Sequence, residues 1–278
     1  MKAKVLIVDD EPLNRKLIKA ALSQEQYDIE EASDGSMALE RIKADPPDLI
    51  LLDVMMPRMD GWEVTKMVKK NPETMNIPII LITALDNITD KLRGLELGAD
   101  EYLGKPINYL ELRSLVRSMI KLKIYLDENK TVWGETGGYR KPDAPSLYPS
   151  ILLVEDNEKD VKLVENYLQK ESYQIVWTDT GESALEIAGR KDVDLILLDI
   201  LLPNMDGFEV IAHLKQMESV KKVPIMVVSI LQDIINKIKA IDLGASAYLP
   251  KPVNKEELRV RIRNLTMKDV HRLGFAAL

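Results

Sequence analysis

The strongest constraint on the fold is a stretch that occurs twice in the chain. It reads DLILLDVMMPRMDG over 48–61 and DLILLDILLPNMDG over 194–207. In each copy an apolar run ends in an acid, Asp53 or Asp199, and a Pro and an Asp-Gly pair then break it into a loop. Such a run is typical of a strand buried on both faces of a parallel sheet. The acid then lies at the edge where open α/β sheets bind ligands.

The repetition covers both halves of the chain at a constant offset of 146 residues, which is the separation of Asp53 from Asp199. A repeat this long indicates two copies of one domain rather than a solenoid. The length of 278 residues also fits about two domains of ~150 residues. We therefore predict a first domain over 1–128, a linker rich in Gly and Pro over 129–148, and a second domain over 149–278 that ends in a short tail.

Each copy alternates predicted strands with predicted helices, which favours a parallel sheet with helices on both faces. The last helix of the first copy carries an apolar stripe of Leu115, Met119, Leu122 and Leu126, which either belongs to the core or meets a partner or a second chain. In the first copy we expect strands at Lys4–Val8, Tyr27–Ala32, Leu49–Leu52, Ile79–Ile82 and Glu101–Leu103, and helices at Leu13–Leu22, Ser36–Lys43, Gly61–Lys70, Ile88–Leu97 and from Tyr109 to about Leu126. The second copy is expected to end in a helix around Lys255–Leu265.

Composition excludes several classes of protein. The chain has no cysteine, so it has no disulfide framework, which fits a reducing cytoplasm. Its net charge of −7 argues against direct binding of nucleic acid. No apolar run approaches the ~18 residues of a membrane span, and the two histidines cannot form a His-rich metal site. We expect a cytoplasmic protein without membrane contact.

Acids also end the first predicted strand of each copy, as Asp9-Asp10 and Glu155-Asp156. If that strand lies beside the third strand, these acids converge on Asp53 and Asp199. Three carboxylates so close together repel unless one is protonated or a cation lies among them. An all-oxygen ligand set suits Mg²⁺, with Mn²⁺ as the alternative.

Thr83 and Lys105, expected at the ends of the fourth and fifth strands, add a hydroxyl and an ammonium to the first acidic cluster. Together with a metal-bound carboxylate these groups indicate a phosphoryl site. Phosphoryl transfer depends mainly on positioning and charge neutralisation, and an ionised Asp53 needs no general base to act as the nucleophile.

At this point a family resemblance is evident. Both copies resemble the receiver domain of two-component response regulators, in VDDEP and VEDNE, LLDVMMP and LLDILLP, LITA and VVSI, and YLGKP and YLPKP. The resemblance covers nearly the whole of each copy and implies two flavodoxin-like (βα)5 domains with parallel sheet order 2-1-3-4-5. It further implies that a histidine kinase or phosphotransfer protein phosphorylates the chain, which then switches its contacts with a downstream protein or within a homodimer.

The resemblance also assigns roles to individual residues. Asp53 and Asp199 would accept the phosphoryl group, Asp10 and Asp156 would bind Mg²⁺ directly, and Asp9 and Glu155 would support them. The remaining roles are the carbonyls of Met55 and Leu201 as metal ligands, Thr83, Ser229, Lys105 and Lys251 as ligands of phosphoryl oxygens, Tyr102 and Tyr248 as the aromatic switch, and Pro106 and Pro252 after a cis peptide bond.

One departure separates the copies. Ala84 follows Thr83, whereas Ile230 follows Ser229, and the larger side chain is expected to crowd the second pocket. We therefore expect Asp53 to be phosphorylated faster than Asp199.

Two other functions compete with this one. The first copy resembles the leading receiver of diguanylate cyclases in DVMMPRMDGWEV and LITALDN, so the chain is alternatively an input and dimerisation module of a truncated cyclase, with the second copy as an adaptor. A phosphatase of the haloacid dehalogenase type uses similar groups, but its nucleophile lies on the first strand. No separate catalytic or output domain is expected, so we predict a phosphoacceptor rather than an enzyme.

Overall fold

The computed structural model describes residues 2–84, 88–135, 148–190 and 192–270. The chain divides into two compact units, Met1–Tyr139 and Arg140–Leu278. Most of the predicted linker and the final residues of the predicted tail lie outside the described residues, so those boundaries stay predictions.

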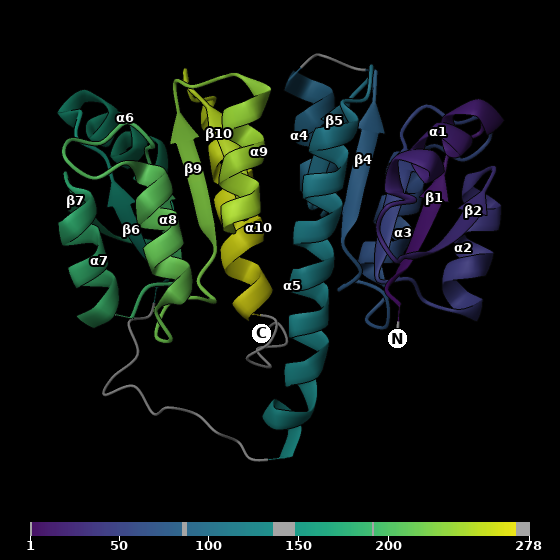
Figure 1. The fold of residues 1–278 in the computed structure, drawn as a ribbon, viewed down its shortest axis with the longest axis horizontal. Coiled ribbons are helices and arrows are strands. Elements are labelled where there is room, and N and C mark those ends of the chain that lie inside the picture. The colour runs from purple at the N-terminus through teal and green to yellow at the C-terminus, as the bar shows by residue number, and fades with distance from the viewer. Residues whose placement is uncertain (1, 85–87, 136–147, 191, 271–278) are drawn as a thin grey trace. The chain divides into compact units, whose positions relative to one another are not determined.

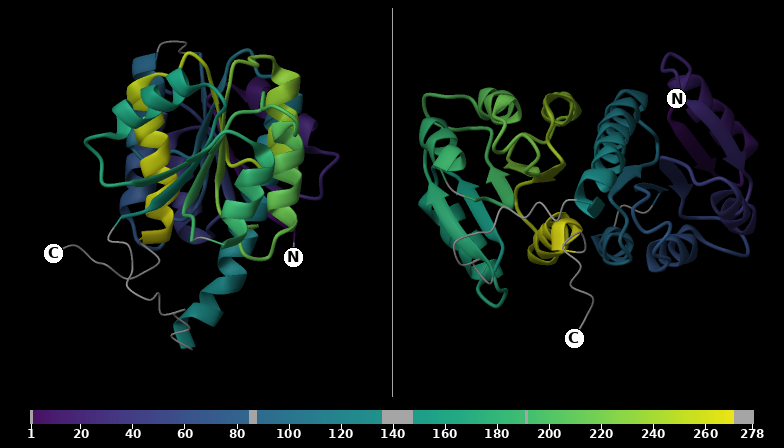
Figure 2. Two further views of the ribbon diagram at one scale, coloured as in Figure 1. Left: turned by 90° about the vertical axis from the view of Figure 1, so that its left-hand side faces the viewer. Right: turned by 90° about the horizontal axis from the view of Figure 1, so that it is seen from below.

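The first unit is a parallel sheet with the strand order β2-β1-β3-β4-β5 and helices on both faces (Figures 1 and 2). Every predicted strand is present within one residue of its expected bounds. The strands are β1 (Lys4–Val8), β2 (Asp28–Ala32), β3 (Leu49–Asp53), β4 (Ile79–Thr83) and β5 (Glu101–Gly104), and the helices are α1 (Pro12–Leu22), α2 (Gly35–Ala44), α3 (Gly61–Lys70), α4 (Ile88–Glu96) and α5 (Tyr109–Glu135). Helix α1 packs against α5, and α2 and α4 pack against α3.

The second unit repeats this topology as β7-β6-β8-β9-β10. Its strands are β6 (Ser150–Val154), β7 (Gln174–Thr178), β8 (Leu195–Leu198), β9 (Ile225–Ser229) and β10 (Ala247–Pro250), and its helices are α6 (Glu158–Leu168), α7 (Gly181–Arg190), α8 (Gly207–Gln216), α9 (Ile234–Leu243) and α10 (Lys255–Val270). The flavodoxin-like order predicted from the resemblance is therefore confirmed in both units. No helix within the described ranges has the length and apolar character needed to cross a membrane.

The central strands are buried because they are apolar up to their last residue, which is Asp53 in β3 and Thr83 in β4. All residues of β3 and β4 are buried, whereas the edge strand β2 is only partly covered. The carboxyl ends of the central strands meet at one edge of the sheet, and helix α3 begins beside them. The carboxylate of Asp60 caps α3 by accepting a hydrogen bond from Glu63 N at 2.8 Å, which fixes where the loop after β3 ends.

Helix α5 is longer than predicted. It runs to Glu135 rather than to about Leu126, so residues 129–135, assigned to the linker, are helical. Leu115 and Met119 of the predicted stripe are buried. The side chains of Leu122 and Leu126 lie outside the described residues, so the partner-binding alternative for this stripe stays a prediction.

A partly buried lysine at the end of the third helix of each unit distinguishes the two units. Lys69 of α3 donates to the carboxylate of Asp100 at 2.9 Å and to the carbonyl of Ile77 at 2.8 Å. Lys215 of α8 occupies the same place and donates to the carbonyls of Lys221 and Val223 at 3.2 and 2.9 Å. The residue in the place of Asp100 is Ser246, and burial lowers the pKa of Lys215 to about 8.

This difference predicts an unusual pH dependence. Below pH 8 Lys215 is charged in both the folded and the unfolded state, so the full penalty for burying its charge destabilises the second unit. As the pH rises from about 8 toward 10.5, only the folded state loses the proton, and the penalty disappears. We expect the free energy of unfolding of the second unit to rise by roughly 1–3 kcal/mol over this window.

The measurement is urea unfolding at pH 7.5 and 9.5, with Trp177 as the fluorophore after Phe replaces the other two tryptophans. Ser246→Asp is expected to stabilise the unit at the lower pH and to remove most of the pH dependence. Ser246→Ala is the matched control, since it adds no carboxylate. If the wild type and Ser246→Asp show the same pH dependence, Lys215 is not its source.

Candidate functional site

The acidic cluster predicted for the first unit forms at the carboxyl edge of its sheet. Strands β1 and β3 are neighbours, with Val8 opposite Leu52, so Asp9 and Asp53 emerge side by side. Asp9 is fully buried and Asp53 is 2% exposed, whereas Asp10 is exposed. One carboxylate oxygen from each of the three lies within 4.8 Å of the others. The first strand therefore lies beside the third, which is the condition under which the sequence predicts that these acids converge.

Lys105 connects this cluster to the end of β5. Its ammonium lies 2.8 Å from Asp53 Oδ2 and 3.3 Å from Asp9 Oδ2. Thr83, the last residue of β4, is buried at the same edge and pairs in register with Gly104. The bond between Lys105 and Pro106 is cis, as the resemblance implies. The first unit thus brings together the acids, the hydroxyl-bearing residue and the lysine expected of a phosphoryl site.

Local hydrogen bonds hold Asp9 in place. Its carboxylate accepts from Glu11 N at 2.9 Å and from Asn14 Nδ2 at 3.1 and 3.2 Å. Its backbone carbonyl accepts from the guanidinium of Arg15 at 2.6 Å, and Arg15 in turn pairs with Glu31 of β2. The buried acid is therefore fixed by α1 and by the edge strand.

The electrostatics favour a cation at this site. Burial raises the pKa of Asp53, and the nearby Asp9 raises it further, although the hydrogen bond from Lys105 opposes both. For Lys105 burial alone would lower the pKa, but the carboxylates of Asp53 and Asp9 outweigh burial and raise it. Lys105 thus stays protonated, and a metal ion among the three acids would relieve their mutual repulsion.

The loop after β3 passes against the start of α3. Gly61 N donates to Val54 O at 3.0 Å, and a Cβ atom on Gly61 would lie 2.4 Å from the carbonyl oxygen of Asp53. The carboxylate of Asp53 accepts a hydrogen bond from Met55 N at 3.3 Å. The Met55 side chain is 58% exposed, which leaves only its backbone to take part in the site.

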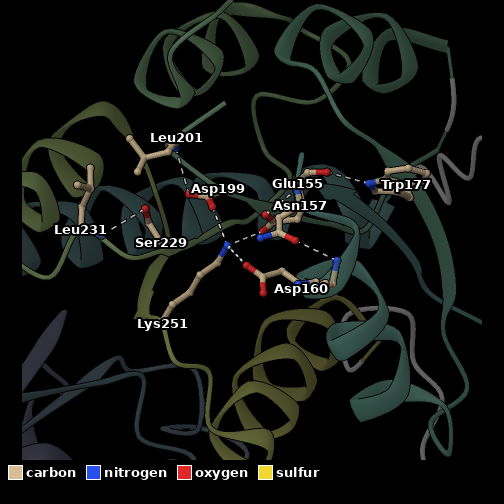
Figure 3. Close-up of polar contacts among 10 residues, drawn as sticks. Glu155, Asn157, Asp160, Trp177, Asp199, Leu201, Ser229, Leu231 and Lys251 are labelled. Carbon is tan, nitrogen blue, oxygen red and sulfur yellow. Dashed lines mark hydrogen bonds and ion pairs between the residues drawn. The ribbon is translucent and has the colours of Figure 1, made fainter. Parts of the chain in front are cut away.

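The second unit arranges its acids around the lysine instead (Figure 3). The Lys251 ammonium lies 2.7 Å from a carboxylate oxygen of each of Glu155, Asp160 and Asp199. Burial would lower the pKa of Lys251, but the three carboxylates raise it well above its usual value. Asp160 did not stand out in the sequence. A residue-by-residue comparison of the two copies would have found it, because the first copy has the neutral Asn14 at the position of Asp160.

The predicted metal ligands of the second unit are not gathered as those of the first. Asp156 is exposed, and within the described residues the only three-acid group close enough to hold a metal is that of Asp9, Asp10 and Asp53. Leu201 N donates to Asp199 Oδ1 at 3.1 Å, as Met55 does to Asp53. The carbonyl of Glu155 accepts a hydrogen bond from the indole of Trp177 at 2.9 Å. In the first unit the corresponding carbonyl, that of Asp9, accepts from Arg15 instead.

The two predicted switch residues differ in position. Tyr102 is partly exposed, with the ammonium of Lys91 4.9 Å from its ring centre. Tyr248 is buried, and its hydroxyl donates to the carbonyl of Leu231. Burial raises the pKa of Tyr248 to about 12, and Asp233 and Asp199 contribute to the rise. The Tyr248 side chain is therefore anchored to the loop that follows β9.

The expected crowding by Ile230 is wrong. Ser229 is fully buried, but the Ile230 side chain is 59% exposed and so extends into solvent. Any difference in reactivity between Asp53 and Asp199 must have another cause.

Comparison with known proteins identifies the family. The model of the response regulator receiver domain matches residues 5–117 and 151–263. The chain therefore belongs to the response regulator receiver family and carries two receiver domains in tandem.

The tandem arrangement recurs in the response regulator PleD of Caulobacter vibrioides. The chain is 35% identical to it over 268 residues, which make up 95% of this chain and 59% of PleD; the chain thus spans about three fifths of that relative. The transcriptional regulatory protein PhoP of Bacillus subtilis is 41% identical over 121 residues, 44% of this chain and 50% of PhoP. The receiver domain of the Francisella response regulator 1452 is 36% identical, with a TM-score of 0.41, and the match covers 43% of this chain and 98% of that one.

These findings bear on the competing functions. The regions matched by the family model are receiver domains, and they do not favour the reading as a cyclase input module. The phosphatase alternative required its nucleophile on the first strand, whereas β1 ends in the acidic pair and Asp53 ends β3.

Proposed function

We propose that Asp53 is the phosphoacceptor of a two-component response regulator. The observation that carries the proposal is the buried Asp53 carboxylate, which lies 2.8 Å from the Lys105 ammonium and beside Asp9 and Asp10. In the transfer, a carboxylate oxygen of Asp53 forms the new P–O bond while the P–N bond to the donor's histidine breaks, and the leaving imidazole nitrogen keeps the electron pair. Lys105 and Thr83 would bind the phosphoryl oxygens and hold them during the step.

The donor atoms of the first pocket fit Mg²⁺, because they are carboxylate oxygens from three acids within 4.8 Å of one another. Asp9, Asp10, Asp53 and the backbone carbonyl of Met55 would hold the ion. When bound, it would supply positive charge beside the phosphoryl oxygens. Mn²⁺ would suit the same ligands.

Asp199 serves in this proposal as a second and slower acceptor, with Ser229 and Lys251 as its phosphoryl-binding groups. The donor is a histidine kinase or a phosphotransfer protein, since such proteins phosphorylate receiver domains. The output is a change in contacts with a downstream protein or within a homodimer, in the cytoplasm. The protein would assist its own phosphorylation rather than turn over a substrate.

Intact-mass measurement tests the proposal. The full chain is incubated with acetyl phosphate and Mg²⁺, or with acetyl phosphate and excess EDTA. We expect one phosphoryl group to appear first and a second more slowly with Mg²⁺, and neither with EDTA. A hydroxylamine-labile label would identify an acyl phosphate. If no label forms with Mg²⁺, or if it resides on a hydroxyl group, the proposed function is wrong.

A further inference from the structure

The second pocket contains an acid that the first pocket lacks. Asp160 lies in the first turn of α6, just after the N-cap Asn157, whose side chain accepts from Lys159 N at 3.0 Å. From this turn its carboxylate points at the Lys251 ammonium (Figure 3). The corresponding residue of the first domain, Asn14, donates hydrogen bonds to Asp9, and among the described residues the carboxylates in contact with Lys105 are those of Asp9 and Asp53.

The contacts of Lys251 use its whole capacity for hydrogen bonding. An ammonium has three N–H donors and no acceptor, and each of the three carboxylates lies 2.7 Å from Lys251 Nζ. Lys105 contacts two carboxylates, one of them at 3.3 Å. Lys251 can therefore donate to a phosphoryl oxygen on Asp199 only after it gives up a contact, whereas Lys105 retains a donor for that purpose.

The walls of the second pocket give the lysine room to reach α6. A cavity of about 110 Å³ lies beside Lys251, Asp160 and Asp199. Val164, Val228 and Val253 line it where the first domain has the larger Ile18, Ile82 and Ile107. The Lys251 side chain is 10% exposed and that of Lys105 is 25% exposed, so the second lysine is the more enclosed of the two.

We propose that Asp160 is a positioning residue that restrains Lys251 and thereby slows phosphorylation of Asp199. This rests on the proposed function, because it concerns the reactivity of the same kind of site. Asp160 acts in two ways: it occupies the Lys251 donor that a phosphoryl oxygen would need, and it adds a negative charge that repels the incoming phosphoryl group. The asymmetry between the two receivers then comes from α6 and not from Ile230.

The test is the rate at which each aspartate of the full chain is labelled by acetyl phosphate and Mg²⁺, followed by mass spectrometry of peptides. Asp160→Asn restores the residue type of the first domain and is expected to raise the maximal labelling rate of Asp199 about tenfold, the effect of one hydrogen bond between charged groups. Asp160→Glu keeps the carboxylate and is expected to stay near the slow wild-type rate. The reciprocal Asn14→Asp is expected to slow Asp53.

Two features separate this role from a structural one. Replacing a residue that only supports the fold would slow the labelling of Asp199. Replacing a residue that restrains Lys251 would accelerate it, so the direction of the change in rate distinguishes the two roles. Glu158→Gln is the matched control, because it removes a charge from the same turn of α6, where Glu158 faces Lys162 and is 75% exposed. It is expected to leave the Asp199 rate unchanged.

The outcomes also separate this inference from the proposed function. If Asp53 is labelled but Asp160→Asn does not label Asp199 faster than the wild type does, the role of Asp160 is overturned and the phosphoacceptor assignment of Asp53 stands. If Glu158→Gln accelerates Asp199 as much as Asp160→Asn does, general charge explains the rate and the specific restraint of Lys251 is overturned. If neither aspartate is labelled in any variant, the proposed function fails, and the role of Asp160 fails with it.

Discussion

Replacing Asp53 with Asn is expected to abolish phosphoryl labelling of the first receiver and to leave its fold intact. The amide oxygen of Asn can still accept the hydrogen bond that Met55 N donates to Asp53. However, a neutral amide is not a nucleophile and cannot form an acyl phosphate. Because burial and Asp9 raise the pKa of Asp53, its ionised form is disfavoured in the folded domain. Without Mg²⁺ the variant is therefore expected to be at least as stable as the wild type.

Peptide mass spectrometry after incubation with acetyl phosphate and Mg²⁺ measures the loss, and urea unfolding measures the stability. Asp60→Asn is the matched control: it makes the same change in the same loop, and Asn is as good an N-cap as Asp. The control is expected to be labelled like the wild type. A first receiver that is still labelled after Asp53→Asn would show that another residue is the acceptor.

Gly61→Ala is expected to destabilise the first receiver strongly. The new Cβ would lie 2.4 Å from Asp53 O and 2.8 Å from Val54 Cα, and both are backbone atoms that no change of rotamer can move. Overpacking costs ~1–3 kcal/mol, and a clash with backbone belongs at the upper end, about 3 kcal/mol. Ala is a better helix former than Gly by at most ~1 kcal/mol. The clash outweighs this gain, so the variant is expected to be less stable than the wild type. The loop that carries Asp53 would shift, and labelling would fall as well.

Amide hydrogen exchange of peptides from β3 follows the first receiver separately from the second. Gly104→Ala is the control, because nothing lies within 4 Å of a Cβ at that position, and it is expected to leave exchange unchanged. If the amides of β3 exchange as slowly in Gly61→Ala as in the wild type, the close approach of α3 to the acceptor strand is not a rigid constraint.

Patterns along the chain predicted the fold and most of the first site. A strand such as Leu49–Asp53 is apolar up to its final acid and is followed by a loop with turn residues, so its position follows from local sequence. The parallel topology brings the carboxyl ends of the strands together, and this explains why Asp9, Asp53 and Lys105 could be grouped without a structure. Because the domain is repeated, each of these sequence patterns occurs twice in the chain.

The sequence could not show what depends on the direction of a side chain. Ile230 was expected to crowd the pocket, but it faces solvent. Asp160 lies on a helix face, and only the path of Lys251 across the pocket reveals their contact. The end of α5 was also misplaced, because residues beyond Leu126 lack strong apolar periodicity, and helix formers such as Glu128 and Lys130 continue the helix to Glu135.

The two receivers secure the loop after their first strand with different chemistry. In the first, the Asp9 carbonyl is held by Arg15, whose guanidinium contacts Glu31, and Lys19 contacts the same acid at 2.9 Å. In the second, the neutral indole of Trp177 holds the Glu155 carbonyl. Dissolved ions weaken the attraction between partly exposed charges increasingly as the ionic strength rises, and they affect a hydrogen bond from a neutral indole much less. Rising ionic strength is therefore expected to weaken the Arg15 and Lys19 contacts of the first loop more than the Trp177 hydrogen bond of the second, which makes the ionic composition of the surroundings a variable to which the two halves of this chain respond unequally.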